Sequence, residues 1–104
     1  MNFAVFTGAN LRSSSFVMGS LDAAHFEQAD LYGSIVWVSA QHTSFENTNL
    51  EEVNFRCDFR GASFSGANVR NTSFDGCTFD ETTVLPDGSH WTPKTDLSIY
   101  GAKI

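Results

Sequence analysis

A large apolar residue recurs about every five positions through most of this chain. An α-helix repeats its faces every 3.6 residues and a simple strand every two, so neither element accounts for this period. A small residue stands two positions before most of the large ones, as Ala9 does before Leu11. A short unit repeated in this way predicts a solenoid, whose successive coils stack around a continuous core. The large positions are Phe6, Leu11, Phe16, Leu21, Phe26, Leu31 and Val36, then Phe45, Leu50 and Phe55, then Phe64, Val69, Phe74, Phe79 and Val84.

The columns of similar residues predict a coil with four sides. In an extended segment alternate side chains share a face, so the small and the large residue of each unit both point inward. Because five is odd, the chain must turn within each unit to keep the next large residue inside. The two positions after the large residue supply this turn, as Ser65 and Gly66 do. Residue type repeats after four units, since the first column contains Phe6, Phe26, Phe45, Phe64 and Val84 and the second contains Leu11, Leu31, Leu50 and Val69. The fourth column contains Leu21, Ala40, Phe59 and Phe79, and both units that are one residue shorter fall in this column.

The individual units also resemble a known repeat. They read Ala9-Asn10-Leu11-Arg12-Ser13, Ala29-Asp30-Leu31-Tyr32-Gly33 and Thr48-Asn49-Leu50-Glu51-Glu52. This pattern resembles the pentapeptide-repeat family over residues 2–85. The resemblance implies an all-β fold, the right-handed quadrilateral β-helix, and the handedness comes from the resemblance alone. We therefore expect about four coils in a β-helix over residues 1–85 and a short C-terminal cap or tail over residues 86–104.

The two ends of the repeat differ. After Val84 the segment Leu85-Pro86-Asp87-Gly88 is a turn signal, and a similar Pro-Asp-Gly turn and Trp-Thr-Pro step often follow bacterial pentapeptide arrays. An end of a solenoid needs a cap, and we expect Trp91 to cover Phe79 and Val84. The first coil shows no such signal. Three arrangements stay open there: an end-to-end homodimer, a longer protein, or residues 1–3 folded over the end.

The sequence shows no catalytic, cofactor-binding or metal-binding motif. It lacks a G-x-S-x-G elbow, a phosphate-binding G-x-x-x-x-G-K and an H-E-x-x-H pair. Cys57 and Cys77 are expected to stack in adjacent coils as small buried residues. Two cysteines provide too few ligands for a structural metal and form no disulfide framework. We therefore expect no catalytic residue, no cofactor and no metal, and hence no enzyme.

The charge and the apolar runs of the chain limit the kinds of partner that it is expected to bind. Twelve acidic residues against six basic ones give a net charge of −6, whereas nucleic-acid binders usually carry a basic stripe. The longest apolar run, residues 35–38, is far too short to cross a membrane. No signal-peptide pattern is visible. We expect a cytoplasmic protein that makes no direct contact with nucleic acid or membrane.

Two groups of outward side chains depart from the general polar background. The first is apolar and lies on the third side of the coil, where an exposed apolar group predicts contact with a protein. The second is acidic and lies on the first and second sides. The third-side patch consists of Val17, Met18, Ile35 and Trp37, and the acidic face consists of Glu27, Asp30, Glu46, Glu51 and Glu52.

These groups support two functional hypotheses. The preferred one is a non-enzymatic structural or protein-interaction module that presents a rigid β-helical surface to a protein partner. The alternative follows from the resemblance, because some pentapeptide-repeat proteins mimic B-form DNA, bind type II topoisomerases such as gyrase and protect them from quinolones. Duplex DNA carries about one charge per 1.7 Å, or roughly twelve over 20 Å. The net charge of −6 gives this chain a lower density, which favours the interaction module.

Overall fold

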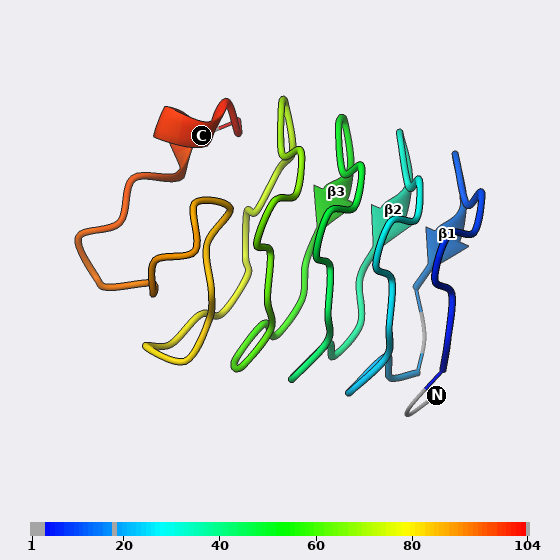
Figure 1. Cartoon of the computed structure of the whole chain (residues 1–104), viewed down its shortest axis with the longest axis horizontal. Coiled ribbons are helices and arrows are strands. Elements are labelled where there is room, and N and C mark those ends of the chain that lie inside the picture. Colours follow the sequence, from blue (N-terminus) through cyan, green and yellow to red (C-terminus); the bar gives the residue numbers. More distant parts are fainter. Residues whose placement is uncertain (1–3, 18, 104) are drawn as a thin grey trace.

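The computed structural model describes residues 4–17 and 19–103 of the 104-residue chain. The chain winds into successive coils along one axis, and the molecule measures 31 × 22 × 22 Å (Figure 1). Strands β1 (Ser15–Phe16), β2 (Ile35–Val36) and β3 (Asn54–Phe55) pair in parallel in the order β1-β2-β3. A short 3-10 helix, η1 (Leu97–Tyr100), follows the coils near the C-terminus.

Each side of the coil is held by a ladder of parallel β-bridges. Partners in a ladder are mostly 19 or 20 residues apart, as Asp30 is from Asn10 and from Asn49. The chain therefore makes four extended segments before it returns to the same side, which confirms the four-sided coil predicted from the columns. The ladders contain Val5, His25, Ser44, Ser63 and Val84 on the first side, Asn10, Asp30, Asn49 and Asn68 on the second, Ser15, Ile35, Asn54, Ser73 and Lys103 on the third, and Ser20, Ser39, Asp58 and Thr78 on the fourth.

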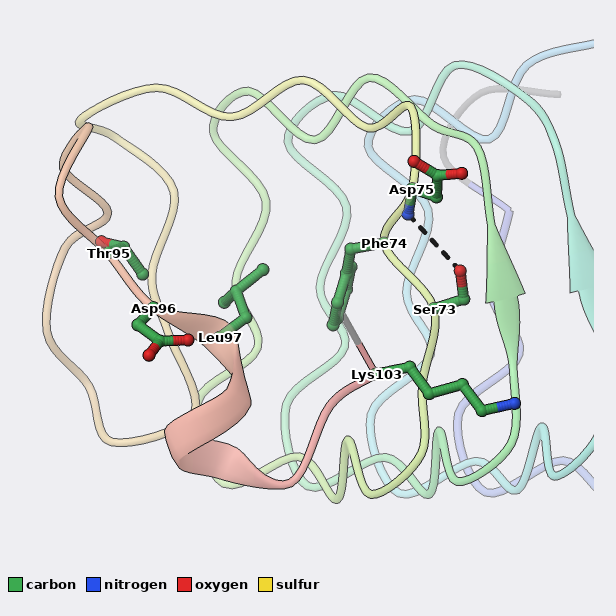
Figure 2. Close-up of a pocket in the computed structure, with 7 residues that line it drawn as sticks. All are labelled: Ser73, Phe74, Asp75, Thr95, Asp96, Leu97 and Lys103. Atoms are coloured by element: carbon green, nitrogen blue, oxygen red, sulfur yellow. Dashed lines mark hydrogen bonds between the residues drawn. The ribbon is translucent and has the colours of Figure 1, made fainter.

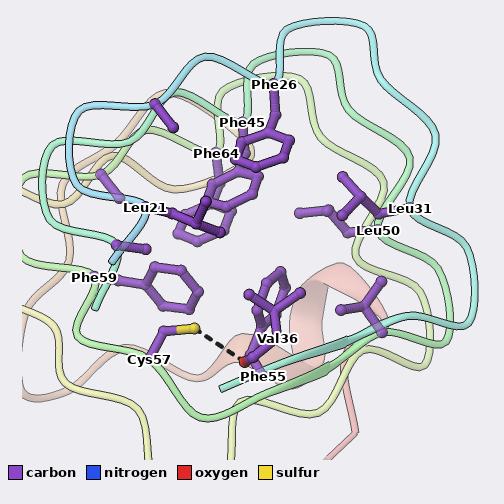
Figure 3. Packing of buried hydrophobic residues seen from close by; sticks show 14 of the residues in the cluster. Leu21, Phe26, Leu31, Val36, Phe45, Leu50, Phe55, Cys57, Phe59 and Phe64 are labelled. Atoms are coloured by element: carbon purple, nitrogen blue, oxygen red, sulfur yellow. Dashed lines mark hydrogen bonds between the residues drawn. The ribbon is translucent and has the colours of Figure 1, made fainter. Parts of the chain in front are cut away.

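The large inward side chains fill the interior of the coils (Figure 3). In the first column Phe26, Phe45 and Phe64 stack, with ring centroids 5.1 and 5.3 Å apart and planes within 9° of parallel. Phe55 and Phe59 meet edge to face, with centroids 4.9 Å apart and planes at 83°. Both arrangements are favourable for aromatic rings. Phe residues that recur in the first column therefore stack their rings along the axis of the rod.

The small inward positions are stabilised by hydrogen bonds between coils. The buried hydroxyl of Thr43 donates to the carbonyl of Leu21 at 2.9 Å, and the thiol of Cys57 donates to the carbonyl of Val36 at 3.1 Å (Figure 3). A buried hydroxyl without a partner would be destabilising, so these bonds explain why polar small residues are tolerated in the core. Equivalent bonds join Thr48 to Phe26, Thr72 to Leu50 and Thr83 to Phe59.

The predicted core position of Val84 is wrong by one residue. Val84 lies on the outward row of the first side, and Leu85 is the buried residue, with 3% of its surface exposed. Leu85 comes six residues after Phe79, whereas the earlier large residues follow one another at four or five. The preceding corner accommodates the additional residue, because the Asp80 carboxylate accepts hydrogen bonds from the amide and the hydroxyl of Thr82. The longer corner keeps the next large side chain inside.

The segment after Leu85 lies over one end of the coil stack (Figure 1). The indole of Trp91 stacks on the ring of Phe79, with centroids 5.9 Å apart and planes at 19°. Farther along, Lys103 pairs in parallel with Ser73 and adds a bridge to the third-side ladder. The C-terminal segment thus returns to the coils that it follows and covers part of their last apolar layer.

Candidate functional site

The third-side patch is an exposed apolar surface beside the three-stranded sheet. Ile35 projects outward from β2, while Val17 and Trp37 occupy equivalent corner positions in successive coils. Their exposed fractions are 48% for Val17, 38% for Ile35 and 39% for Trp37. Met18, the fourth predicted member, lies outside the described residues. The structure therefore places the three described members on one face, in an arrangement typical of surfaces that contact other molecules.

Side chains from the next coil hold the indole of Trp37. Its N–H donates to Oδ1 of Asn54 at 3.4 Å, and the guanidinium carbon of Arg56 lies 4.8 Å from the ring centroid. Arg56 is not among the residues predicted from the sequence for this surface. Its position in the repeat could have indicated this contact, because Arg56 occupies the same outward corner position as Trp37 in the next coil. An aromatic side chain already held in place loses little conformational freedom on binding.

Neighbouring side chains engage part of the acidic face. Glu27 lies 3.0 Å from Nδ1 of His25, and Asp30 accepts a hydrogen bond from the Arg12 guanidinium at 3.0 Å. Glu46 accepts a hydrogen bond from a serine hydroxyl of the next coil at 3.2 Å. The Asp30 and Glu46 contacts join one coil to the next, whereas His25 and Glu27 belong to the same unit. In each case an oxygen of the carboxylate already has a partner within the protein.

Asp30 shows how these contacts act on a carboxylate. Burial opposes its ionisation, but hydrogen bonds from the Tyr32 amide and the Arg12 guanidinium outweigh burial and hold the pKa of Asp30 below its ordinary value. In contrast, the carboxylates of Glu51 and Glu52 have no hydrogen-bond or ion-pair partner within residues 4–17 and 19–103. The acidic face therefore presents fewer free carboxylates than its sequence suggests.

A pocket of about 490 Å³ opens where the third side meets the C-terminal segment (Figure 2). One wall is formed by residues 73–75 of the third side and another by residues 95–97, which lead into η1. This pocket could not be predicted from the repeat, because the repeat ends before the second wall begins. Its lining residues are Ser73, Phe74, Asp75, Thr95, Asp96, Leu97 and Lys103.

Two further properties concern only the described part of the chain. Among residues 4–17 and 19–103, no group of three or more His, Cys, Asp or Glu side chains could hold a metal ion. Over the same ranges, no helix has the length and apolar character needed to cross a membrane.

The two cysteines are free thiols in adjacent coils. The amide of Cys57 donates to Sγ of Cys77 at 3.4 Å. Burial raises the pKa of Cys57 to about 11 and that of Cys77 to about 12. Because the thiolate is the reactive species, both groups are poor nucleophiles at neutral pH.

We expect both thiols to react slowly with a disulfide reagent in the folded protein. An exposed cysteine has a pKa of about 8.5, so at pH 8 the native thiols should react at least about 100-fold more slowly than those of the urea-unfolded chain. Release of thionitrobenzoate at pH 8, followed with and without urea, measures the ratio. Equal rates in the two conditions would contradict the burial of these side chains.

The bridge ladders, inward columns and regular corners define a class of protein, the four-sided parallel β-helical repeat proteins. Within that class, the sequence matches the family described as pentapeptide repeat region over residues 9–84. The chain belongs to this family, as its units predicted. No curated protein sequence matches the chain.

Two solved structures are similar to this chain. A pentapeptide repeat protein from the cyanobacterium Cyanothece 51142 is 28% identical with a TM-score of 0.56, and the match covers 82% of this chain and 63% of that one. HetL, a pentapeptide repeat protein involved in heterocyst differentiation regulation in Nostoc sp. strain PCC 7120, is 21% identical with a TM-score of 0.62, and the match covers 86% and 42%. The chain spans less than two thirds of the length of either protein. The likeness to HetL concerns the fold alone.

Proposed function

We propose that this chain is a non-enzymatic protein-interaction module, a right-handed four-sided β-helix whose third side binds a protein partner. The observation that carries the proposal is the joint exposure of Val17, Ile35 and Trp37 on one face. The ladders and the filled core fix the backbone beneath these side chains, so little ordering is required when a partner binds. Membership in the family supports the right-handed sense of the coil.

The chemistry of the third-side patch suggests what the partner presents. Trp and Arg are the residues most enriched in binding hot spots, and here the Arg56 guanidinium lies against the Trp37 ring. Arg56 forms no ion pair with any residue in the described ranges 4–17 and 19–103. A partner that seats an apolar side chain on Ile35 and Trp37, with a carboxylate beside Arg56, would complement both features.

We favour this module over an acidic mimic of DNA. A mimic needs a dense row of free negative charges, because duplex DNA carries about one charge per 1.7 Å. Glu27, Asp30 and Glu46 already accept hydrogen bonds or ion pairs from neighbouring side chains. The third-side patch, in contrast, has exposed apolar surface and an unpaired cation within the described chain.

We expect Trp37→Ala to weaken partner binding at least about 30-fold, the loss that corresponds to a hot spot of about 2 kcal/mol. The partner is isolated from a lysate of the source organism on immobilised wild-type protein, and its affinity is then measured by calorimetry. Ile99→Ala serves as the control, because Ile99 is 70% exposed and lies outside the patch. Unchanged affinity of Trp37→Ala, with a wild-type circular dichroism spectrum, would contradict the proposal.

A supercoiling assay with gyrase separates the two functions. The interaction module should neither inhibit gyrase nor protect it from a quinolone. A DNA mimic would do one or the other, and the effect would disappear when Glu46, Glu51 and Glu52 are all changed to Lys. Inhibition that shows this charge dependence would favour mimicry over the proposed module.

A further inference from the structure

The pocket beside the C-terminal segment exposes an aromatic ring that the cap leaves partly uncovered. Phe74 stacks on Phe55 in the coil before it, with centroids 5.6 Å apart and planes at 17°. The last ring of the fourth side, Phe79, is covered by the stacked indole of Trp91. No ring is stacked in the same way on the other face of Phe74 among the described residues, and this side chain stays partly exposed in the pocket. Leu97 supplies further apolar surface there (Figure 2).

Two carboxylates accompany this apolar surface. Asp75 directly follows Phe74, and its carboxylate has no hydrogen-bond or ion-pair partner in residues 4–17 and 19–103. Asp96 accepts hydrogen bonds from the hydroxyl and the amide of Ser98, at 2.6 and 3.0 Å, and these hold its pKa below the ordinary value. Asp96 is therefore negatively charged at neutral pH, and Asp75 adds a second carboxylate to the lining.

Lys103 is the basic residue of the lining. In Figure 2 its side chain extends away from Asp96 and Leu97. It forms no ion pair with a described residue, so neither Asp75 nor Asp96 is neutralised by it. The side chains of the pocket thus combine an aromatic face, an aliphatic wall and an excess of negative charge.

We propose that this pocket binds a cation carried on an alkyl chain, an ammonium or a guanidinium group. The carboxylates of Asp75 and Asp96 attract the charge, and the face of an aromatic ring such as Phe74 attracts a cation as well. Leu97 contacts the apolar stem. The volume of about 490 Å³ lies in the range of small-ligand sites, roughly 300–1,000 Å³.

Two sources could deliver this group, a free aliphatic amine or a Lys or Arg side chain of another protein. The chemistry that the pocket recognises is the same for both. The site does not depend on the proposed function, because none of Val17, Ile35 and Trp37 lines the pocket. A failure of either proposal leaves the other standing.

Titration of the full chain, followed by amide NMR shifts, tests the site with three probes. These are n-butylammonium, Nα-acetyl-lysine N-methylamide and the uncharged Nα-acetyl-norleucine N-methylamide. We expect saturable shifts at residues 73–75 and 95–97 with a cation, and at least tenfold weaker binding of the norleucine compound. The cation that binds more tightly identifies the source, a free amine for n-butylammonium and a protein side chain for the lysine compound.

Variants test the two carboxylates separately. Asp75→Asn and Asp96→Asn should each weaken cation binding at least fivefold, and Asn still accepts the hydrogen bonds that cap η1. Asp80→Asn, in a corner that does not line the pocket, should bind as the wild type does. Absence of saturable shifts, equal binding of the norleucine compound, or unchanged binding by Asp75→Asn would each overturn the proposal.

A last variant tests whether the chain itself occupies the pocket. Ile104 follows Lys103 in the sequence and lies outside the described residues. Ile104→Ala should bind the cationic probes as the wild type does. Binding that appears only in this variant would also overturn the proposal, because the pocket would then be closed to ligands in the native protein.

Discussion

Replacing Phe55 by alanine should lower the free energy of unfolding by about 3–5 kcal/mol, the usual loss for a buried aromatic residue. Phe55 is 0% exposed, stacks on Phe74 at 5.6 Å and meets Phe59 edge to face at 4.9 Å. Phe59 belongs to the next side of the same coil and Phe74 to the next coil, and both lie in backbone segments held by the bridge ladders. The coils are therefore poorly able to collapse into the space left by the ring, and an unfilled cavity adds to the lost burial.

Urea unfolding followed by circular dichroism at pH 7 measures this loss. The matched control is Ile35→Thr in β2, which changes a partly exposed residue one coil earlier and keeps a β-branched side chain in the strand. We expect the control to change the free energy of unfolding by less than about 1 kcal/mol. A comparable loss in both variants would mean that Phe55 is not the more important packing residue. Equal m-values in the two proteins are required for this comparison.

The columns of the fold were predictable from the sequence because the geometry of the coil repeats. Phe26, Phe45 and Phe64 are spaced by 19 residues, and each spacing returns the chain to the same side of the coil. Inward direction, side of the coil and ring stacking all follow from that spacing. The hydrogen bonds of the small inward residues were not predictable in this way, because a Thr such as Thr43 satisfies the pattern by its size and its hydroxyl is used only in three dimensions.

The candidate site was predictable only to the extent that it follows the columns. The exposure of Ile35 and Trp37 could be inferred from their outward positions. The contact of Arg56 with the Trp37 ring depends on the conformations of two long side chains, which spacing does not determine. The pocket forms because the C-terminal segment folds back and places Lys103 beside Ser73. This segment follows the repeat, so the repeat pattern does not predict its path.

The acidic face shows a different limit of the sequence. The acidic face contains five carboxylates in the sequence, but their spacing does not show which basic side chains of the neighbouring coil lie beside them. Arg12 precedes Asp30 by 18 residues and forms an ion pair with it at 3.0 Å, because the coil brings the two side chains together. A residue that is remote in sequence can thus reduce the free charge of a surface when the coil brings it beside a carboxylate.

The error at Val84 had a specific cause, because both residues at the end of the repeat are apolar. A unit of five residues selects Val84 as the core position, and a unit of six selects Leu85. Hydrophobicity alone cannot separate these registers. The hydrogen bonds of the Asp80 carboxylate with Thr82 stabilise the longer corner and favour the second register. The turn bond of this corner, from the Thr83 amide to the Asp80 carbonyl at 3.0 Å, starts one residue after Phe79 and accompanies the register in which Leu85 is buried.

Leu85→Ala should consequently lower the free energy of unfolding by about 2–4 kcal/mol, whereas Val84→Ala should cost less than about 1 kcal/mol. Leu85 is 3% exposed, and Val84 lies on the outward row that pairs with Ser63. Urea unfolding of the two variants under identical conditions provides the measurement. A shift of one residue exchanges the inward and outward faces of an extended segment, so the two registers predict opposite rankings. A larger loss for Val84→Ala would show that the unit keeps five residues, and the ranking of the two variants decides between the registers even if both losses are smaller than expected.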